Sequence, residues 1–220
     1  MYDTDTIVIH AYYSQEVITI SRPHFEKQRK DKLRKILESA RQVFCRKGFL
    51  AVKMQDIIDE CSISRGGIYI YFASVDEIFL AVMKERNREK MSSITKSVLE
   101  HEPFADVLDA YMSKQKARLV NFENSLFRAY CEYIFSKPKA AVHAFRDTQL
   151  NQLRTTVETI LKLGVSQGVI ENQDLTQLAI HFIATIDGLS ILALGDALSE
   201  ETIDLQFKVL NEMLYKKLQK

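Results

Sequence analysis

The sequence predicts an all-α fold in which amphipathic helices enclose one or two cores. Apolar residues recur at intervals of three and four from about residue 26 to the carboxyl end, as on the buried face of a helix. The 220 residues include only seven glycines and three prolines, so few positions interrupt helices. With 46% hydrophobic residues, the chain is also long and apolar enough to bury a substantial core.

One long helix and two short ones are predicted for the amino-terminal third. The long helix runs from about Glu26 to Lys47, and Gly48 ends it because glycine readily takes a positive φ. A short helix then ends near Cys61, and another begins after Ser64. The apolar residues of the two short helices are spaced to pack them crosswise on the first helix, which predicts a helix-turn-helix.

Longer helices are predicted for the rest of the chain. Ser74 is the expected N-cap of the first, because Glu77 stands three residues later in the capping-box position. Further amphipathic segments run from Phe104 to about Phe122, Ser125 to Phe135, Lys139 to Gln167, Leu175 to Leu194 and Thr202 to Leu218. The segment from 175 to 194 is apolar on more than one face, which favours burial against a partner, with packing on its own chain as the alternative.

The first 25 residues stand outside the helical pattern. Their segments "TIVIHAYY" and "EVITI" are rich in β-branched and aromatic residues. An extra strand, an arm, a disordered tail and an upstream translated stretch all fit this composition. We therefore expect three parts: an N-terminal extension (1–25), a helix-turn-helix domain (26–73) and a helical domain (74–220).

Charge is distributed unevenly along the chain. Between residues 22 and 53, eleven lysines and arginines stand against three acidic residues, so this segment carries +8 while the whole chain carries +1. A basic end on an acidic remainder is typical of proteins that bind a polyanion. A solvated lysine-rich helix face would give the same count.

No motif supports an enzyme, a metal protein or a membrane protein. The five histidines show no HExxH or Glu-x-x-His spacing, and neither a Gly-x-Ser-x-Gly motif nor a P-loop occurs. We expect no catalytic residue, no metal and no cofactor. No run of eighteen apolar residues predicts a membrane span. Cys45, Cys61 and Cys131 lack CxxC spacing, which suits reduced core thiols in a cytoplasmic protein.

The segment "SISRGGIYIYF", residues 62–72, carries most of the expected DNA contacts. In a helix-turn-helix the start of the second short helix enters the major groove. Gly66 and Gly67 would let the backbone approach the duplex closely, and Ser64 can cap the helix by accepting a bond from either amide. The predicted DNA-binding residues are Lys53, Gln55, Ser64, Arg65, Gly66, Gly67, Tyr69, Ile70 and Tyr71.

Each side chain of this segment has an expected partner. Arg65 is placed to reach a phosphate or a guanine edge. The hydroxyls of Tyr69 and Tyr71 can reach phosphates, which position a domain without specifying sequence, and Ile70 could touch a thymine methyl. Core packing is the alternative for the tyrosines, but their two-residue spacing on a helix leaves at least one exposed.

Residues 48–82, "GFLAVKMQDIIDECSISRGGIYIYFASVDEIFLAV", resemble the DNA-binding domain of the TetR family of bacterial transcriptional repressors. The match covers about residues 29–85. Its features are "KGF" after the first helix, "DI" in the second, Ser-Arg-Gly-Gly-Ile-Tyr-x-Tyr-Phe in the third and Ser-x-Asp-Glu at the start of the fourth.

Three positions depart from the family pattern. Val52 and Lys53 stand where the second helix usually opens with Thr or Ser, so a hydroxyl cap and its phosphate contact are lost and Lys53 supplies a charge instead. Ser62 replaces a frequent glycine, and Val75 replaces a frequent lysine, which removes another phosphate contact.

The resemblance implies a ligand-responsive repressor of about nine helices. Such a protein is a homodimer on palindromic half-sites of double-stranded DNA, released when a small molecule in the C-terminal domain moves the two DNA-reading domains apart. The helix that begins after Ser74 would link the two domains. A DNA-binding protein of the same fold without an inducer is the first alternative, and an all-helical enzyme is a weaker one.

Aromatic density and the polar residues among it suggest where a ligand would bind, although core packing is the alternative for each residue. The predicted ligand-binding residues are Tyr111, Phe127, Tyr130, Tyr133, Phe145, Gln149, His181, Phe182 and Thr185. The last two helices are expected to form the dimer interface, through Phe182, Ile186, Leu189, Phe207, Leu210 and Leu214. Asp187, in a nearly apolar helix, is expected to pair across that interface.

Overall fold

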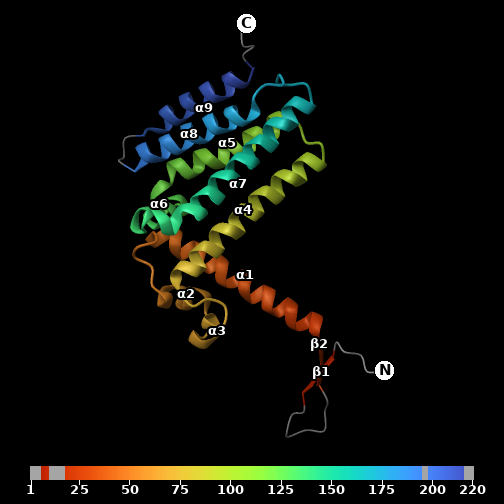
Figure 1. The fold of residues 1–220 in the computed structure, drawn as a ribbon, viewed down its shortest axis with the longest axis vertical. Coiled ribbons are helices and arrows are strands. Elements are labelled where there is room, and N and C mark those ends of the chain that lie inside the picture. The colour runs from red at the N-terminus through yellow and green to blue at the C-terminus, as the bar shows by residue number, and fades with distance from the viewer. Residues whose placement is uncertain (1–5, 10–17, 195–197, 216–220) are drawn as a thin grey trace. The chain divides into compact units, whose positions relative to one another are not determined.

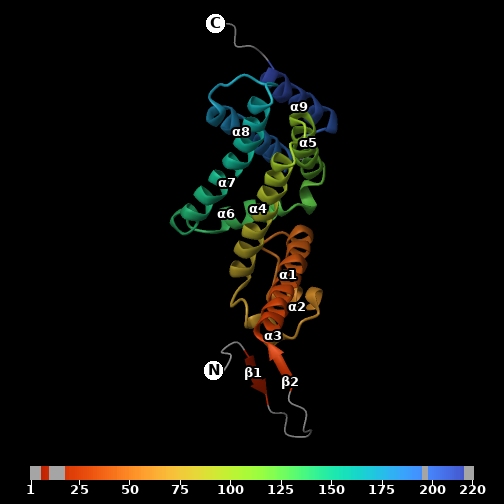
Figure 2. The same cartoon turned by 90° about the vertical axis from the view of Figure 1, so that its right-hand side faces the viewer.

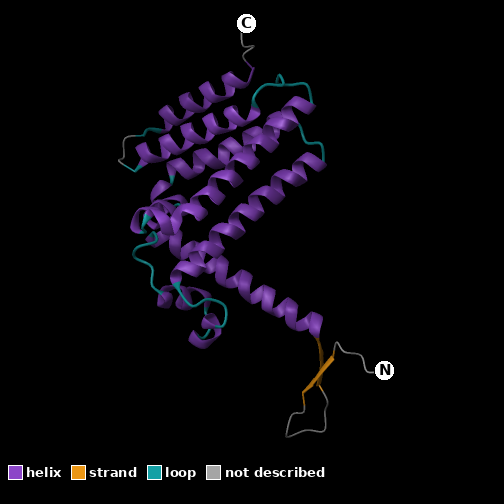
Figure 3. Cartoon of the chain, viewed as in Figure 1, coloured by secondary structure: helices purple, strands orange, loops and turns teal. Residues whose placement is uncertain are grey.

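The computed structural model describes residues 6–9, 18–194 and 198–215. Helices dominate these ranges, as Figure 3 shows, and the predicted all-α class is confirmed. The elements are β1 (Thr6–Ile9), β2 (Ile18–Ser21), α1 (Arg22–Lys47), α2 (Met54–Cys61), α3 (Arg65–Tyr69), α4 (Val75–Leu99), α5 (Phe104–Val120), the 3-10 helix η1 (Phe122–Asn124), α6 (Leu126–Ser136), α7 (Lys139–Ser166), α8 (Leu175–Ala193) and α9 (Glu200–Tyr215).

These elements form two compact units that share two helices. Unit 1 comprises residues 1–43 and 53–82, and unit 2 comprises residues 44–52 and 83–220. Both α1 and α4 therefore begin in unit 1 and end in unit 2 (Figure 1). The sequence placed a domain boundary at residue 73, whereas the start of α4, up to Val82, groups with unit 1.

The N-terminal extension contains a β-hairpin that leads directly into α1. β1 pairs antiparallel with β2, with Thr6 opposite Ser21. α1 starts at Arg22, four residues earlier than predicted. Pro23 occupies its first turn, where the missing N–H of proline interrupts no helical hydrogen bond.

Unit 1 has a small core where α1, α2, α3 and α4 contribute fully buried side chains. Ile36 and Ala40 of α1, Ile57 of α2, Ile68 of α3 and Phe79 of α4 are 0% exposed. The predicted caps are present. Ser64 Oγ accepts a hydrogen bond from the Gly67 amide at 3.2 Å, and Ser74 Oγ accepts one from the Glu77 amide at 3.2 Å.

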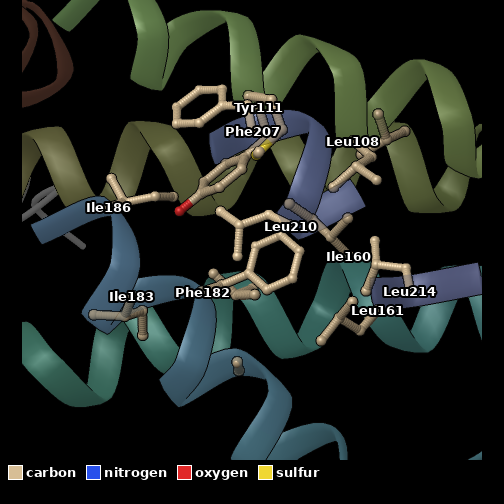
Figure 4. Packing of buried hydrophobic residues seen from close by; sticks show 14 of the residues in the cluster. Leu108, Tyr111, Ile160, Leu161, Phe182, Ile183, Ile186, Phe207, Leu210 and Leu214 are labelled. Carbon is tan, nitrogen blue, oxygen red and sulfur yellow. The ribbon is translucent and has the colours of Figure 1, made fainter. Parts of the chain in front are cut away.

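Unit 2 has a larger core, formed chiefly by α5, α7, α8 and α9. Figure 4 shows Leu108, Ile160, Phe182 and Leu210, one from each helix, pointing toward one another. Figures 1 and 2 show α8 and α9 together at the end of unit 2 that carries the C-terminus. α8 is long and apolar enough to cross a membrane, but core helices pass the same test, and its inward side chains belong to this core.

The six side chains assigned to a dimer interface need correction, because all of them lie in the core of the chain itself. Phe182, Ile186 and Leu189 of α8 and Phe207, Leu210 and Leu214 of α9 are each at most 9% exposed. The helix face with the largest apolar side chains packs against the core of its own chain. The outward faces of α8 and α9 carry other apolar residues.

Candidate nucleic-acid interface and internal cavity

The turn between α2 and α3 adopts the geometry expected of a helix-turn-helix. Ser62 ends α2 in the left-handed region, at φ 51° and ψ 41°. Glycine is favoured at such a position, which agrees with the glycine that the family pattern leads us to expect there. Ser64 then caps α3, so only three residues separate the two helices.

The predicted DNA-contacting face of α3 is largely open to solvent. Arg65 is exposed, and its guanidinium lies 5.9 Å from the centroid of the Tyr69 ring. Tyr69 and Ile70 are 43% and 77% exposed, whereas Tyr71 is half-buried. An exposed isoleucine beside an exposed arginine and tyrosine has no role in the core of unit 1, so this face is available to a partner.

The two adjacent glycines differ in their surroundings. A Cβ atom added at Gly66 would meet nothing within 4 Å. At Gly67 it would lie 2.9 Å from Ile63 Cγ2 and 3.0 Å from Ser64 Oγ, the atom that caps the helix. The turn therefore requires Gly67, while nothing in the free chain requires Gly66.

The start of α2 shows how the departures from the family pattern are accommodated. Val52 is buried, at 8% exposed, and thus cannot face a phosphate. The amide of Lys53, the N-cap, donates to Asp56 Oδ2 at 2.8 Å. The side chains of Lys53 and Gln55 are exposed, and Gln55 Nε2 donates to Asp59 Oδ1 at 2.7 Å.

Unit 2 contains a cavity of about 120 Å³, lined by residues of α4, α5, α6, α7 and α8. One water needs roughly 10–15 Å³, so the space suits a small organic molecule. Four predicted ligand-binding residues line it: Tyr111, Phe127, Tyr130 and Gln149. The other five, Tyr133, Phe145, His181, Phe182 and Thr185, are not among its lining residues.

Charged side chains from three helices also line the cavity. They are Arg86 and Lys90 of α4, Arg118 of α5 and Asp187 of α8. Asp187 thus lines the cavity, whereas the sequence predicted that it pairs across a dimer interface. Burial raises the pKa of the Asp187 carboxyl, and Arg118 and Lys90 oppose that rise.

Burial also shifts the basic and phenolic groups around this carboxyl. It lowers the pKa of Lys90 to about 8, helped by the positive charges of Arg86 and Arg118. It raises the pKa of Tyr111 to about 12. The cavity is therefore a desolvated site in which charge is expensive to hold.

Sequence reasoning missed the basic residues of this cavity. A signal was present on α4, where Met83, Asn87, Lys90 and Ile94 follow the helical spacing i, i+4, i+7 and i+11. Met83 and Ile94 are buried, so the polar residues between them face the same interior. In this chain, polar side chains within an apolar helical stripe therefore identify cavity-lining residues better than aromatic density does.

An amide bridge links α4 and α7 beside the cavity. Asn87 Nδ2 donates to Gln149 Oε1 at 2.7 Å and to Gln152 Oε1 at 2.6 Å. Asn87 lines both this cavity and an outer groove of α4 and α7. The bridge therefore stands between the two spaces.

α6 connects the cavity wall to the turn that follows α1, and all of these residues belong to unit 2. Phe127 and Tyr130 of α6 line the cavity. Two residues after Tyr130, Glu132 Oε2 accepts hydrogen bonds from the amides of Phe49 at 2.7 Å and Leu50 at 2.9 Å. Arg128 Nε in turn donates to Glu132 Oε1 at 3.0 Å and holds the carboxylate in place.

Comparisons with known proteins agree with this architecture. The family model described as "Bacterial regulatory proteins, tetR family" matches residues 36–82. The uncharacterized HTH-type transcriptional regulator YfiR of Bacillus subtilis (strain 168) is 29% identical over 177 residues, which covers 76% of this chain and 82% of YfiR.

Solved structures show the same fold over most of the chain. A putative transcriptional regulator from Saccharomonospora viridis, in complex with choline, has a TM-score of 0.64 at 22% identity, covering 84% of this chain and 95% of its own. FadR from Bacillus subtilis, in complex with stearoyl-CoA, has a TM-score of 0.59 at 19% identity, covering 84% and 99%. Residues 36–82 therefore form a DNA-binding domain of the tetR type, and these similarities indicate that the chain is a DNA-binding transcriptional regulator rather than an enzyme.

Proposed function

We propose that this regulator is a cytoplasmic homodimeric repressor that leaves its operator when a small molecule occupies the cavity of unit 2. The observation that carries the proposal is the position of α6. One face of α6 supplies Phe127 and Tyr130 to the cavity, and Glu132 on the same helix holds the turn after α1. A ligand that displaces the aromatic rings would thus act on the end of a helix that begins in the DNA-binding unit.

α4 offers a second connection of the same kind. Its residues Arg86 and Lys90 line the cavity, while the start of the helix belongs to unit 1. Because α4 is continuous, a shift at Lys90 reaches the helix-turn-helix core through Phe79, which is fully buried there. A ligand changes the DNA affinity only if it binds the two arrangements of these helices differently.

The fold is known to hold small molecules. The structures from Saccharomonospora viridis and of Bacillus subtilis FadR were solved with choline and with stearoyl-CoA. These two ligands share little chemistry. They support ligand binding within this fold, but they do not indicate which ligand this chain binds.

The outward faces of α8 and α9 support a homodimer. On α8, Ile180, Ala184, Gly188 and Ile191 are exposed at helical spacing, and a Cβ at Gly188 would meet nothing within 4 Å. On α9, Leu205 and Val209 are 55% and 50% exposed. A stripe of small and branched apolar residues lets two helices approach closely, and a C2 partner presents the same stripe.

Selection of bound duplexes from a random DNA pool tests the DNA-binding part, and the expected product is a palindromic site. The recovered operator then serves in a fluorescence-anisotropy screen of small molecules for release. Loss of binding with a compound that also raises the melting temperature supports the proposal. A protein that binds its operator unchanged with every compound that occupies the cavity contradicts ligand-controlled release.

A further inference from the structure

We infer that the ligand of the unit 2 cavity is a small organic carboxylate with a flat apolar body, its acidic group bound between Arg118 and Lys90. This inference rests on the proposed ligand-controlled function and names the chemical class of the ligand. Three observations on the cavity wall carry it: an unsatisfied guanidinium, an excess of positive charge and a wall of aromatic and branched side chains.

The guanidinium of Arg118 is held in place but incompletely paired. Nη2 donates to Ser190 Oγ at 3.2 Å, and the group lies 4.4 Å from the centroid of the Phe127 ring. Nε is buried, and among the described residues it has no hydrogen-bond partner. A buried donor without an acceptor is costly, and an acidic oxygen of a ligand beside Arg118 would supply one. Guanidinium geometry matches a carboxylate, which can accept two parallel bonds.

The charges around the cavity do not balance. Lys90 and Arg118 line it, against the single carboxylate of Asp187 among its lining residues. Within the described part of the chain, neither Lys90 nor Arg118 forms an ion pair with Asp187. Partly desolvated cations of this kind are costly to keep unpaired. An anion neutralises the excess, whereas a cationic ligand would add to it.

The remainder of the wall is apolar and shaped by rings. Phe127 and Tyr130 lie 5.7 Å apart, with an angle of 30° between their planes. Leu153 of α7 and Ile183 and Ile186 of α8 line the same space. Aromatic side chains in the wall favour an apolar guest with a flat face, and a cavity of about 120 Å³ limits its size. The combination of apolar walls and a few convergent polar groups is typical of a small-molecule site.

Matched sets of compounds that share a body test the inference. Benzoate, phenylacetate and indole-3-acetate are each compared with their amide and with the amine of the same skeleton, by thermal shift and calorimetry on the full chain. We expect at least one carboxylate to bind, and its amide and amine to bind at least about tenfold more weakly. An amide or amine that binds as tightly as its carboxylate overturns the inference, and so does the absence of binding by all three carboxylates.

Variants show whether the acidic group lies where the structure assigns it. Arg118→Gln should abolish the preference for the carboxylate, and Lys90→Gln should weaken it about tenfold. Lys114→Gln, on the exposed side of α5, should leave it unchanged. The melting curve of each variant without ligand reports whether it folds. If Arg118→Gln does not fold, Lys90→Gln alone tests the position of the acidic group. Carboxylate binding that survives the loss of the cavity cations places the ligand elsewhere and overturns the assignment.

The same compounds separate this inference from the proposed function. A carboxylate that binds in the cavity but leaves the operator complex intact supports the ligand class and contradicts ligand-controlled release. A neutral or cationic compound that binds in the cavity and releases the operator supports the function and overturns the ligand class.

Discussion

At the scale of single residues, the two glycines at the start of α3 differ in their expected roles. Gly67 is required by the turn, whereas Gly66 is expected to matter only for contact with DNA. Gly66→Ala should raise the free energy of unfolding by up to about 1 kcal/mol, because the new methyl meets nothing and glycine disfavours helices. It should nevertheless weaken operator binding, because the methyl stands where the backbone would approach the duplex. Urea unfolding and anisotropy titrations measure the two effects.

Gly67→Ala is the matched comparison. Its methyl would crowd Ile63 Cγ2 and the capping Ser64 Oγ, so we expect a loss of about 1–2 kcal/mol of stability. Operator binding by Gly66→Ala equal to that of the unaltered chain would show that the backbone does not come close to DNA at this position.

Lys90 gives a second prediction at this scale, because burial lowers its pKa to about 8 from the usual 10.5. Between these pH values the unfolded chain binds more protons than the folded chain, so this group makes the free energy of unfolding rise with pH. Below pH 8 the buried charge persists and costs up to about 3 kcal/mol. Lys90→Met should therefore be more stable than the unaltered chain at pH 7, and the difference should shrink from pH 8 upward.

Unfolding in urea from pH 7 to 10 checks this prediction. Burial raises the pKa of the Cys131 thiol to about 11, which lowers stability above pH 9, but this effect is common to both proteins and cancels in the difference. Lys84→Met on the exposed side of α4 is the control and should show no pH-dependent gain. A constant difference across this range would contradict a buried ammonium at Lys90.

At the scale of elements, the sequence did not predict that α6 links the cavity to the turn after α1. Its period predicted an amphipathic segment from Ser125 to Phe135, close to the observed Leu126–Ser136. Its contact with the turn after α1 depends on residues about 83 positions apart, joined by Glu132 and the amide of Phe49. Local periodicity finds a helix because the signal lies within a few turns, whereas a polar contact at such separation leaves no periodic trace.

The contrast between the two sites has the same physical origin. The predicted DNA-contacting face lies on one short contiguous segment, so its cap could be predicted from the sequence, down to the bond between Ser64 and Gly67, while its contacts with DNA stay a prediction. The cavity is assembled from five helices, and the aromatic residues alone did not show which of them face it. Tyr130 does, while Tyr133, three residues later on α6, packs at 4.9 Å against Phe49 instead.

Glu132→Ala tests the role assigned to α6. It leaves the amides of Phe49 and Leu50 without their acceptor, so we expect a loss of about 1–3 kcal/mol of stability. We also expect ligand binding to persist while ligand-dependent release of the operator weakens. Calorimetry and anisotropy measure the two separately.

Glu123→Ala is the control for this variant, since Glu123 pairs with Arg128 at 3.1 Å but is mostly exposed and does not touch the turn. It should change stability by less than about 1 kcal/mol and leave release intact. Full release by Glu132→Ala would show that the signal leaves the cavity by another route, with α4 as the remaining connection.

At the scale of the whole molecule, the proposed homodimer depends on the outward faces of α8 and α9. Ile191→Glu and Val209→Glu each place a charge on an exposed apolar stripe, at 53% and 50% exposed in the single chain, so folding should survive. Burying an unpaired charge in a dimer interface costs several kcal/mol, and the double variant should therefore be monomeric at micromolar concentration by light scattering. Because the proposed dimer reads two half-sites together, a monomer should lose most of its operator affinity.

Phe135→Glu is the control, because Phe135 of α6 is 79% exposed and lies outside the proposed interface, so this variant should remain dimeric. A double variant that stays dimeric with its operator affinity intact would place the interface on another surface of the molecule.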